Sequence, residues 1–575
     1  MIRKKVYCWM VAVATACLLS SHSYAQDISQ IAKSDPLIIT GAVGTQNTYY
    51  HSSVGDGYSS PLSNMVFLNM NISVYGFSMP FSLYYTNDNL DFSYPHLSFN
   101  LNPRYKNWAG YLGRSSMSYS PYVMDMSFNG IGLEYNDGKR WRFGAFYGQL
   151  RSAINDDPTD PAARRPQYKR LGWGFKMGYG NATNYLDLYF LRAYDRLSSI
   201  DEHWQQLIAP QENIVVGIKG SVQPLRYLSL TANVASSIFS TDTRADLVEN
   251  NATVDRWNTV FDTRYSSLAR FAGDVSATLS LQGVNASVFY RMIQPDYTSL
   301  GTYYMSNNYQ ALGLSLSTML LNTVSLAATF SGQSDNLTDR QLYTTKGYVY
   351  SAVASTRIAQ NYNLTASYSG YTQSQGDGTA KVNDTTKVDR IMQSFSLTPS
   401  ASFDTDDFTH SVSLTGSLTD NKDRNKFATG ESDVTSWALG LGYGLNVKSW
   451  ETDLSLNLSH QVSDGYLTTY SSDIASLGVS RSFLKEKELS LGATLSLCYN
   501  EVKDQSKSLS MGGEASLGYT LNKVHVFSLM AGVNKYGDVN VVKRRSSLDQ
   551  TDVNVSFNYT YTFSLLELKR KAEKK

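Results

Sequence analysis

The side chains that could act as nucleophiles, bases or metal ligands are few in this sequence and lie far apart. The 575 residues include seven histidines and three cysteines. No pair of histidines has the HExxH spacing or another metal-ligand spacing. The G-x-S-x-G, P-loop and G-x-G-x-x-G patterns of hydrolases and nucleotide-binding proteins do not occur either. The sequence therefore predicts no catalytic residue, no metal site and no cofactor, and we expect a protein that is not an enzyme.

Polar and apolar residues alternate with a period of two along most of the chain, which indicates β-strands with one polar and one apolar face. The clearest runs lie at 439–447, 454–459, 489–500 and 553–563, where Leu, Val, Phe and Tyr alternate with Ser, Thr, Asn and Gly. The longer runs last about 10–14 residues, against ~5–6 for strands of globular proteins and ~9–11 for strands that cross a membrane. Gly440, Gly442 and Gly444 have this spacing too, so they give room on one strand face and do not cradle a phosphate.

The connections between these strands alternate between tight turns and longer polar loops. Outer-membrane barrels have short turns on the periplasmic side and long loops outside, whereas soluble sandwiches do not sort their loops in this way. We expect an all-β fold, a transmembrane antiparallel up-and-down β-barrel of about 24–26 strands, with 26 if a weak strand forms near His96–Asn102. An even number places both termini in the periplasm.

The ends of the chain define the remaining segments. Arg3, Lys4 and Lys5 precede an apolar run from Val6 to Leu19, and Ser23-Tyr24-Ala25 offers small residues for cleavage, which is typical of a secretory signal peptide. We therefore expect a signal peptide at 1–25, a short periplasmic segment at 26–36, the barrel at 37–565 and a basic periplasmic tail at 566–575. Removal of the signal peptide leaves Cys498 as the one cysteine, so no internal disulfide is expected.

Charged residues at inward positions are the first candidate site. A charge that faced lipid at the midplane would cost ~2–4 kcal/mol, so these charges are expected to face the lumen. They either pair with each other and with lumen-filling loops, or line a permeation path or a docking surface. The candidate lumen-lining residues are Arg142, Lys176, Asp187, Lys219, Asp274 and Arg291.

The stretch 87–122 is the second candidate, because three prolines and many aromatic residues interrupt its alternation. Irregular backbone at membrane depth is tolerated only where protein or water satisfies it. Part of the stretch is therefore expected to enter the lumen as a constriction or partial plug, the alternative being an ordinary aromatic loop. The candidate constriction residues are Tyr94, Pro95, His96, Pro103, Arg104, Tyr105 and Trp108.

Several segments resemble large outer-membrane β-barrel proteins of the Bacteroidota type, a poorly characterised family similar to porins or to TonB-dependent receptors without a plug domain. The similar segments are WAGYLGRSSMSYSPY (108–122), GIGLE (130–134), WRFGAFYGQL (141–150) and YRMIQPDYTSLGTYY (290–304). The resemblance implies the fold and a Gram-negative outer-membrane location, and it brings no substrate. The chain differs from TonB-dependent receptors in having only 26–36 before the first strand, and from usual barrels in lacking an aromatic last residue.

Three functions remain open for such a barrel. The first is a transport or export pore for an unknown substrate. The second is a plugged scaffold that binds a secreted or surface partner, and the third is an outer-membrane enzyme. The partners expected are outer-membrane lipid, the barrel-assembly machinery and, for the scaffold, that secreted or surface protein. Lys plus Arg number 50 and Asp plus Glu 49, and this near-zero net charge argues against a nucleic-acid partner.

Overall fold

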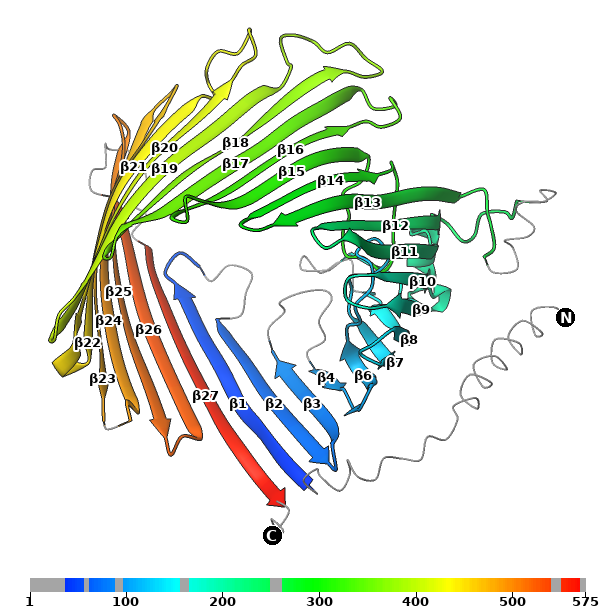
Figure 1. Cartoon of the computed structure of the whole chain (residues 1–575), viewed down its shortest axis with the longest axis horizontal. Helices are drawn as coiled ribbons and strands as arrows, with labels where there is room; N and C mark the ends of the chain where they lie inside the picture. The colour runs from blue at the N-terminus through cyan, green and yellow to red at the C-terminus, as the bar shows by residue number, and fades with distance from the viewer. Residues whose placement is uncertain are drawn as a thin grey trace.

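The strands of this chain form a single closed sheet. The computed structural model describes residues 37–55, 61–87, 97–155, 165–248, 261–484, 486–538 and 550–568. Consecutive strands pair antiparallel, and the last strand pairs with the first from Leu37 opposite Leu568 to Ser52 opposite Asp552. Figure 1 shows this closure, with β27 in red beside β1 in blue. The predicted antiparallel β-barrel is confirmed.

The strands within the described residues are β1 (Leu37–Ser52), β2 (Leu62–Val74), β3 (Phe77–Thr86), β4 (Leu97–Leu101), β5 (Arg104–Tyr105), β6 (Trp108–Ser115), β7 (Phe128–Asn136), β8 (Trp141–Arg151), β9 (Arg170–Gly180), β10 (Tyr185–Asp195), β11 (Glu212–Leu225), β12 (Leu228–Ser240), β13 (Ser267–Leu281), β14 (Val284–Ile293), β15 (Tyr309–Leu320), β16 (Val324–Asp335), β17 (Tyr343–Ala359), β18 (Tyr362–Asp377), β19 (Asp389–Asp404), β20 (Phe408–Asp423), β21 (Val434–Val447), β22 (Thr452–Gly465), β23 (Thr469–Phe483), β24 (Leu489–Val502), β25 (Ser506–Leu521), β26 (His525–Asp538) and β27 (Gln550–Leu568). In the same residues the helical elements are three short ones, η1 (Leu197–Ser199), α3 (Glu202–Leu207) and η2 (Lys448–Trp450). No helix of the described chain is long and apolar enough to cross a membrane.

The strands β4 and β5 share one position in the wall. Both pair with β3 on one side and with β6 on the other. Pro103, which has no backbone N–H to donate, stands between them and interrupts the ladder. The described chain therefore forms 26 strand positions, and the weak strand expected near His96–Asn102 is the one that makes the number even.

Short and long connections alternate around most of the barrel, as the sequence predicts, although the connections 466–468 and 503–505 at the long-loop rim have only three residues each. One rim carries tight turns such as 75–76, 226–227 and 282–283, and the other carries loops such as 196–211 and 294–308. Both the start of β1 and the end of β27 lie at the short-turn rim, because the number of strand positions is even. The last strand continues to Leu568, three residues beyond the expected barrel boundary at 565. The expected signal peptide and the tail beyond Leu568 lie outside the described residues.

The two faces of the sheet differ in chemistry. Leu439, Leu477 and Leu495 are all more than half exposed on the outward face. Contact of so large an apolar surface with water would be unfavourable. The lumen face of the same strands carries hydroxyl groups that pair across strands, such as Ser436 with Ser463 at 2.8 Å. Alternation along each strand thus produces an apolar belt outside and a polar lining inside, as in barrels that lie in lipid.

We predict that Leu495→Arg prevents assembly, whereas Thr494→Arg is tolerated. The two residues are adjacent in the middle of β24 but lie on opposite faces, and a midplane arginine facing lipid costs ~2–4 kcal/mol. Heat-modifiable gel mobility of outer-membrane fractions measures folded barrel for both variants. Equal loss of folded barrel in the two variants would contradict this assignment of faces.

Candidate functional site

Five of the six candidate lumen residues fall in one row across neighbouring strands. Each member of the row stands opposite the next in the strand register, from β8 to β14. Because barrel strands are tilted, a row perpendicular to them climbs from the short-turn rim at β8 toward the long-loop rim at β14. The row consists of Arg142, Gly178, Asp187, Lys219, Asn233, Asp274 and Arg291.

The lower end of the row is an ion pair that crosses a glycine. Arg142 Nη2 lies 2.8 Å from Asp187 Oδ1, although β9 separates their strands. Gly178 is the β9 residue between them, and a Cβ there would collide with the Asp187 carboxylate. The absence of a side chain at this position is what allows the two charges to meet. Lys219, opposite Asp187, has no ion-pair partner within the described residues.

Lys176, the sixth candidate, also forms an ion pair across a glycine of the intervening strand, in the neighbouring row of lumen-facing residues. Its Nζ lies 2.5 Å from Glu134 Oε1, across Gly144 of β8. The same ammonium group donates a hydrogen bond of 3.0 Å to the carbonyl oxygen of Ser118. Ser118 belongs to residues 116–127, the inward segment, which connects β6 to β7 and lies against the lumen face of the wall.

The inward segment packs against small residues on the lumen face of the wall. Val123 and Ser120 are fully buried, and the segment contributes many members of the largest buried cluster in the described chain. A Cβ on Gly217 would stand 2.6 Å from Val123 Cγ2, and one on Gly144 would stand 2.9 Å from Met117 Cε. Glycines on the lumen face therefore make the space in which the segment lies.

The loop 294–308, the anchoring loop, covers the inward segment from the long-loop side. Backbone N–H groups of Asp125 and Met126 both donate to the carbonyl of Gly301 at 3.1 Å. Ser299 Oγ donates to the carbonyl of Val123 at 2.6 Å, and Tyr297 Oη donates to that of Tyr122 at 2.8 Å. Burial raises the pKa of the Tyr297 phenol, so it stays a neutral donor in this contact.

The wall binds both pieces through two buried amide side chains and one partly buried carboxylate. Asn213 of β11 is fully buried, and its Oδ1 accepts from the backbone N–H of Leu300 at 3.1 Å. Ser120 Oγ donates to Asn233 Oδ1 at 2.8 Å, and Tyr122 Oη donates to Asp274 Oδ1 at 2.5 Å. The inward segment thus contacts the charged row directly at two of its members.

The opposite wall has no such cover within the described chain. On β22 the lumen residues Ser455, Asn457 and Ser459 are exposed, and so is the outward residue Leu458 between two of them. Exposure on both faces means that no described segment packs on this part of the lumen. The lining in the middle of these strands is mostly uncharged and rich in hydroxyl groups, with pairs such as Ser394 and Thr419 at 3.0 Å.

The predicted constriction residues lie elsewhere than in the inward segment. Pro103 stands between β4 and β5, Arg104 and Tyr105 form β5, and Trp108 begins β6 with its ring 4.8 Å from that of Tyr135. These four belong to the barrel wall, and only 116–122 of the predicted stretch 87–122 lies in the inward segment. Tyr94, Pro95 and His96 lie outside the described residues, so their role stays a prediction.

The fold and the lumen define a class, the closed 26-strand antiparallel β-barrel with a partly covered lumen. No protein-family model and no curated protein matches the chain. Among solved structures it is similar to the P pilus usher PapC translocation pore, at 10% identity and TM-score 0.35, over 92% of this chain and 100% of that one.

Two further solved structures show a similar degree of likeness. Acinetobacter baumannii OccAB3 has 10% identity and TM-score 0.31, over 62% of this chain and 93% of its own. The Pseudomonas aeruginosa outer membrane protein OpdK has 12% identity and TM-score 0.31, over 61% and 94%. TM-scores this low carry no argument, so the class rests on the strand pairing of this chain.

We predict that Gly217→Val lifts the inward segment from the wall, because the added side chain would overlap Val123. In a Cys498→Ser background, a cysteine at Ser120 reports this movement, since Ser120 is fully buried. Maleimide labelling of that cysteine should rise at least several-fold in Gly217→Val. Gly440→Val is the matched control, because a Cβ at Gly440 meets nothing closer than 3.9 Å. Unchanged labelling in a folded Gly217→Val barrel would contradict the packing described.

Proposed function

We propose that this chain is an outer-membrane β-barrel that serves as a passage for polar solutes, with the inward segment and the anchoring loop narrowing one side of its lumen. The apolar belt on the outward face supports the membrane location, since a closed barrel is one of two structures that can span lipid. The long loops face the exterior in this proposal, and both ends of the described chain face the periplasm. A Gram-negative bacterium, of the Bacteroidota as the sequence resemblance implies, is the proposed source.

The observation that carries the proposal is the bare wall opposite the inward segment. Barrels of this strand number are wide, and known barrels of 22 strands hold a plug. In the described chain the cover lies over β8 to β14, whereas lumen residues of β22 and β24 remain exposed. A passage along the bare wall is therefore the function that this asymmetry supports best.

The lining of that passage favours weak charge selectivity. In the covered wall Arg142 is paired with Asp187, and Lys176 with Glu134, so their fields largely cancel. On the bare wall the lining residues in the middle of the strands are mostly Ser, Thr, Asn and Gly. Uncharged polar solutes and small ions of either sign are the proposed permeants.

A second candidate, a scaffold that binds a secreted or surface partner, is favoured by contacts among the described parts of the loops above β9 to β13. Arg170 and Asp195 form a buried ion pair of 2.8 Å at this rim, and Arg170 also donates to Gln211. Arg244 Nη1 donates to the carbonyl of Gln205, which joins two neighbouring loops. Contacts of this kind between loops would hold the described parts of the surface together, which suits recognition of a protein.

We predict that the purified protein conducts in planar bilayers with nearly equal permeability to K⁺ and Cl⁻. Asn457→Lys should shift the reversal potential toward anion selectivity, because it adds a charge to the bare wall. Asn457→Gln keeps a similar volume without the charge and should leave selectivity unchanged. A folded barrel that shows no conductance would contradict the pore and favour the scaffold.

A further inference from the structure

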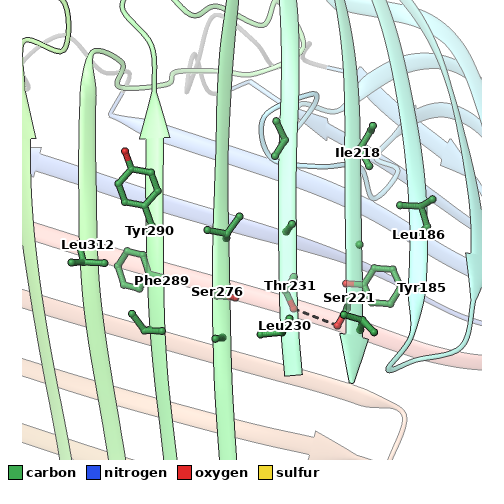
Figure 2. Close-up of a pocket in the computed structure, with 17 residues that line it drawn as sticks. Tyr185, Leu186, Ile218, Ser221, Leu230, Thr231, Ser276, Phe289, Tyr290 and Leu312 are labelled. Atoms are coloured by element: carbon green, nitrogen blue, oxygen red, sulfur yellow. Dashed lines mark hydrogen bonds between the residues drawn. The ribbon is translucent and has the colours of Figure 1, made fainter. Parts of the chain in front are cut away.

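An apolar groove of about 740 Å³ lies on the outward face of β10 to β15. Figure 2 shows its lining, with Leu312 at the left and Leu186 at the right. Small residues make the space, since Gly220 of β11 and Ala232 of β12 stand opposite each other in the register. Gly220 follows the lumen-facing Lys219 in β11, so the groove is on the lipid side and separate from the passage proposed above.

The groove begins at the short-turn rim, which faces the periplasm in the proposed orientation. Val222 and Leu230 belong to its lining and are paired close to the turn 226–227. Leu186 is the second residue of β10 and lies close to the turn 181–184. A lipid chain that lay in this groove would therefore have its headgroup beside these two turns.

Aromatic residues beside the groove mark the level of the lipid headgroups. Tyr179 stands opposite Leu186 in the register, and its ring lies 4.8 Å from that of Trp141. Both rings are exposed on the outward face, and exposed Trp and Tyr at the rim of a barrel are typical of the membrane interface. Arg140 Nη1 donates to Tyr179 Oη at 3.4 Å, so this guanidinium group lies on the lipid side of the rim.

Three basic residues lie along this part of the rim, Lys139 and Arg140 before β8 and Arg226 before β12. None of the three has an ion-pair partner within the described residues. The one acidic residue of these two turns and the turn between them is Asp137, whose Oδ1 accepts three backbone N–H bonds of its own turn. The rim beside the groove therefore carries a net positive charge.

The opposite part of the same rim differs, because its lysines are paired within the chain. Lys448 Nζ lies 2.7 Å from Asp404 Oδ1, and Lys523 Nζ lies 2.6 Å from Glu486 Oε2. A second outward groove, of about 750 Å³ on β19 to β25, has the carboxylate of Asp473 in its lining. The two grooves thus differ in charge, with an acidic residue in one and unpaired basic residues beside the other.

We propose that the groove on β10 to β15 binds an anionic glycerophospholipid. An acyl chain would lie along Gly220 and Ala232, and the charges of Lys139, Arg140 and Arg226 would hold the phosphate at the rim. Lys and Arg keep their charge at neutral pH, so this attraction requires no titration. A zwitterionic lipid would bring a cation that the same residues repel. The proposal rests on the membrane location proposed above but does not require that the lumen conducts.

Native mass spectrometry of the detergent-purified protein, titrated separately with phosphatidylglycerol and phosphatidylcholine, tests this site. Both lipids have a phosphate and acyl chains, but only phosphatidylglycerol has a net negative charge. The wild-type barrel should retain phosphatidylglycerol about tenfold more tightly, the size expected where a few basic side chains attract one net charge. The variant K139Q/R140Q/R226Q should bind the two lipids equally. Equal retention by the wild type, or a preference that survives in the variant, would overturn the proposal.

The matched control is K448Q/K487Q/K523Q, which removes three lysines of the same rim that carboxylates already pair. This variant should keep the preference, and a loss equal to that of K139Q/R140Q/R226Q would contradict a site at the groove. Arg140→Gln and Arg226→Gln should each lose part of the preference, which keeps the test valid if the triple variant folds poorly. Ala232→Phe fills the groove and should weaken binding of both lipids several-fold, whereas unchanged binding would contradict the position of the acyl chain.

Soluble glycerophosphate distinguishes a lipid site from a site for free phosphate. It should displace phosphatidylglycerol only weakly, and displacement as strong as that by the lipid would contradict a role for the groove. A protein that is soluble without detergent would overturn the membrane location and this proposal with it. A folded barrel that prefers phosphatidylglycerol but does not conduct would support this site and overturn the pore alone.

Discussion

Hydrogen bonding of the backbone in a medium without water is the constraint on which this structure depends. In hydrocarbon each unpaired N–H or C=O costs several kcal/mol, so a sheet can lie there only if it has no free edge. Pairing of β1 with β27 along their whole common length removes the last edge. The strand lengths, the even number of positions and the sorting of short and long connections all follow from this closure, because each strand must return the chain to the other rim.

The same constraint explains why the inward segment requires so specific a wall. A chain without regular structure can be held inside a barrel only if other groups take up its backbone bonds. Carbonyls of Tyr122 and Val123 accept from the anchoring loop, and that of Ser118 accepts from Lys176. Glycines such as Gly217 let the segment lie close enough for these bonds to form. The ion pair that crosses Gly178 depends on glycine in the same way, because a side chain there would occupy the space between the two charges.

Much of the fold could be predicted from the sequence, because period-two alternation is a direct consequence of a sheet with lipid on one side. The inward direction of Arg142 and Asp274 was predictable for the same reason, since a charge is excluded from the lipid face. Their arrangement in one row was not, because strand register depends on contacts between strands. The inward segment was found only in part. Its signal is the apolar run around Met124 without alternation, but the partner loop lies far along the chain.

The closure of β1 onto β27 also has a kinetic consequence. The residues that meet there, such as Thr48 and Ser556, are at opposite ends of the chain, so this contact has the largest sequence separation in the barrel. Contacts between distant residues form slowly, because the entropy of closing a long loop is lost before the contact is gained. Until then two edge strands expose unpaired backbone groups, and such edges invite pairing with other chains. The nascent barrel therefore has to hold its first strand in an open state through the folding of every other strand, and the lifetime of that state sets its exposure to aggregation.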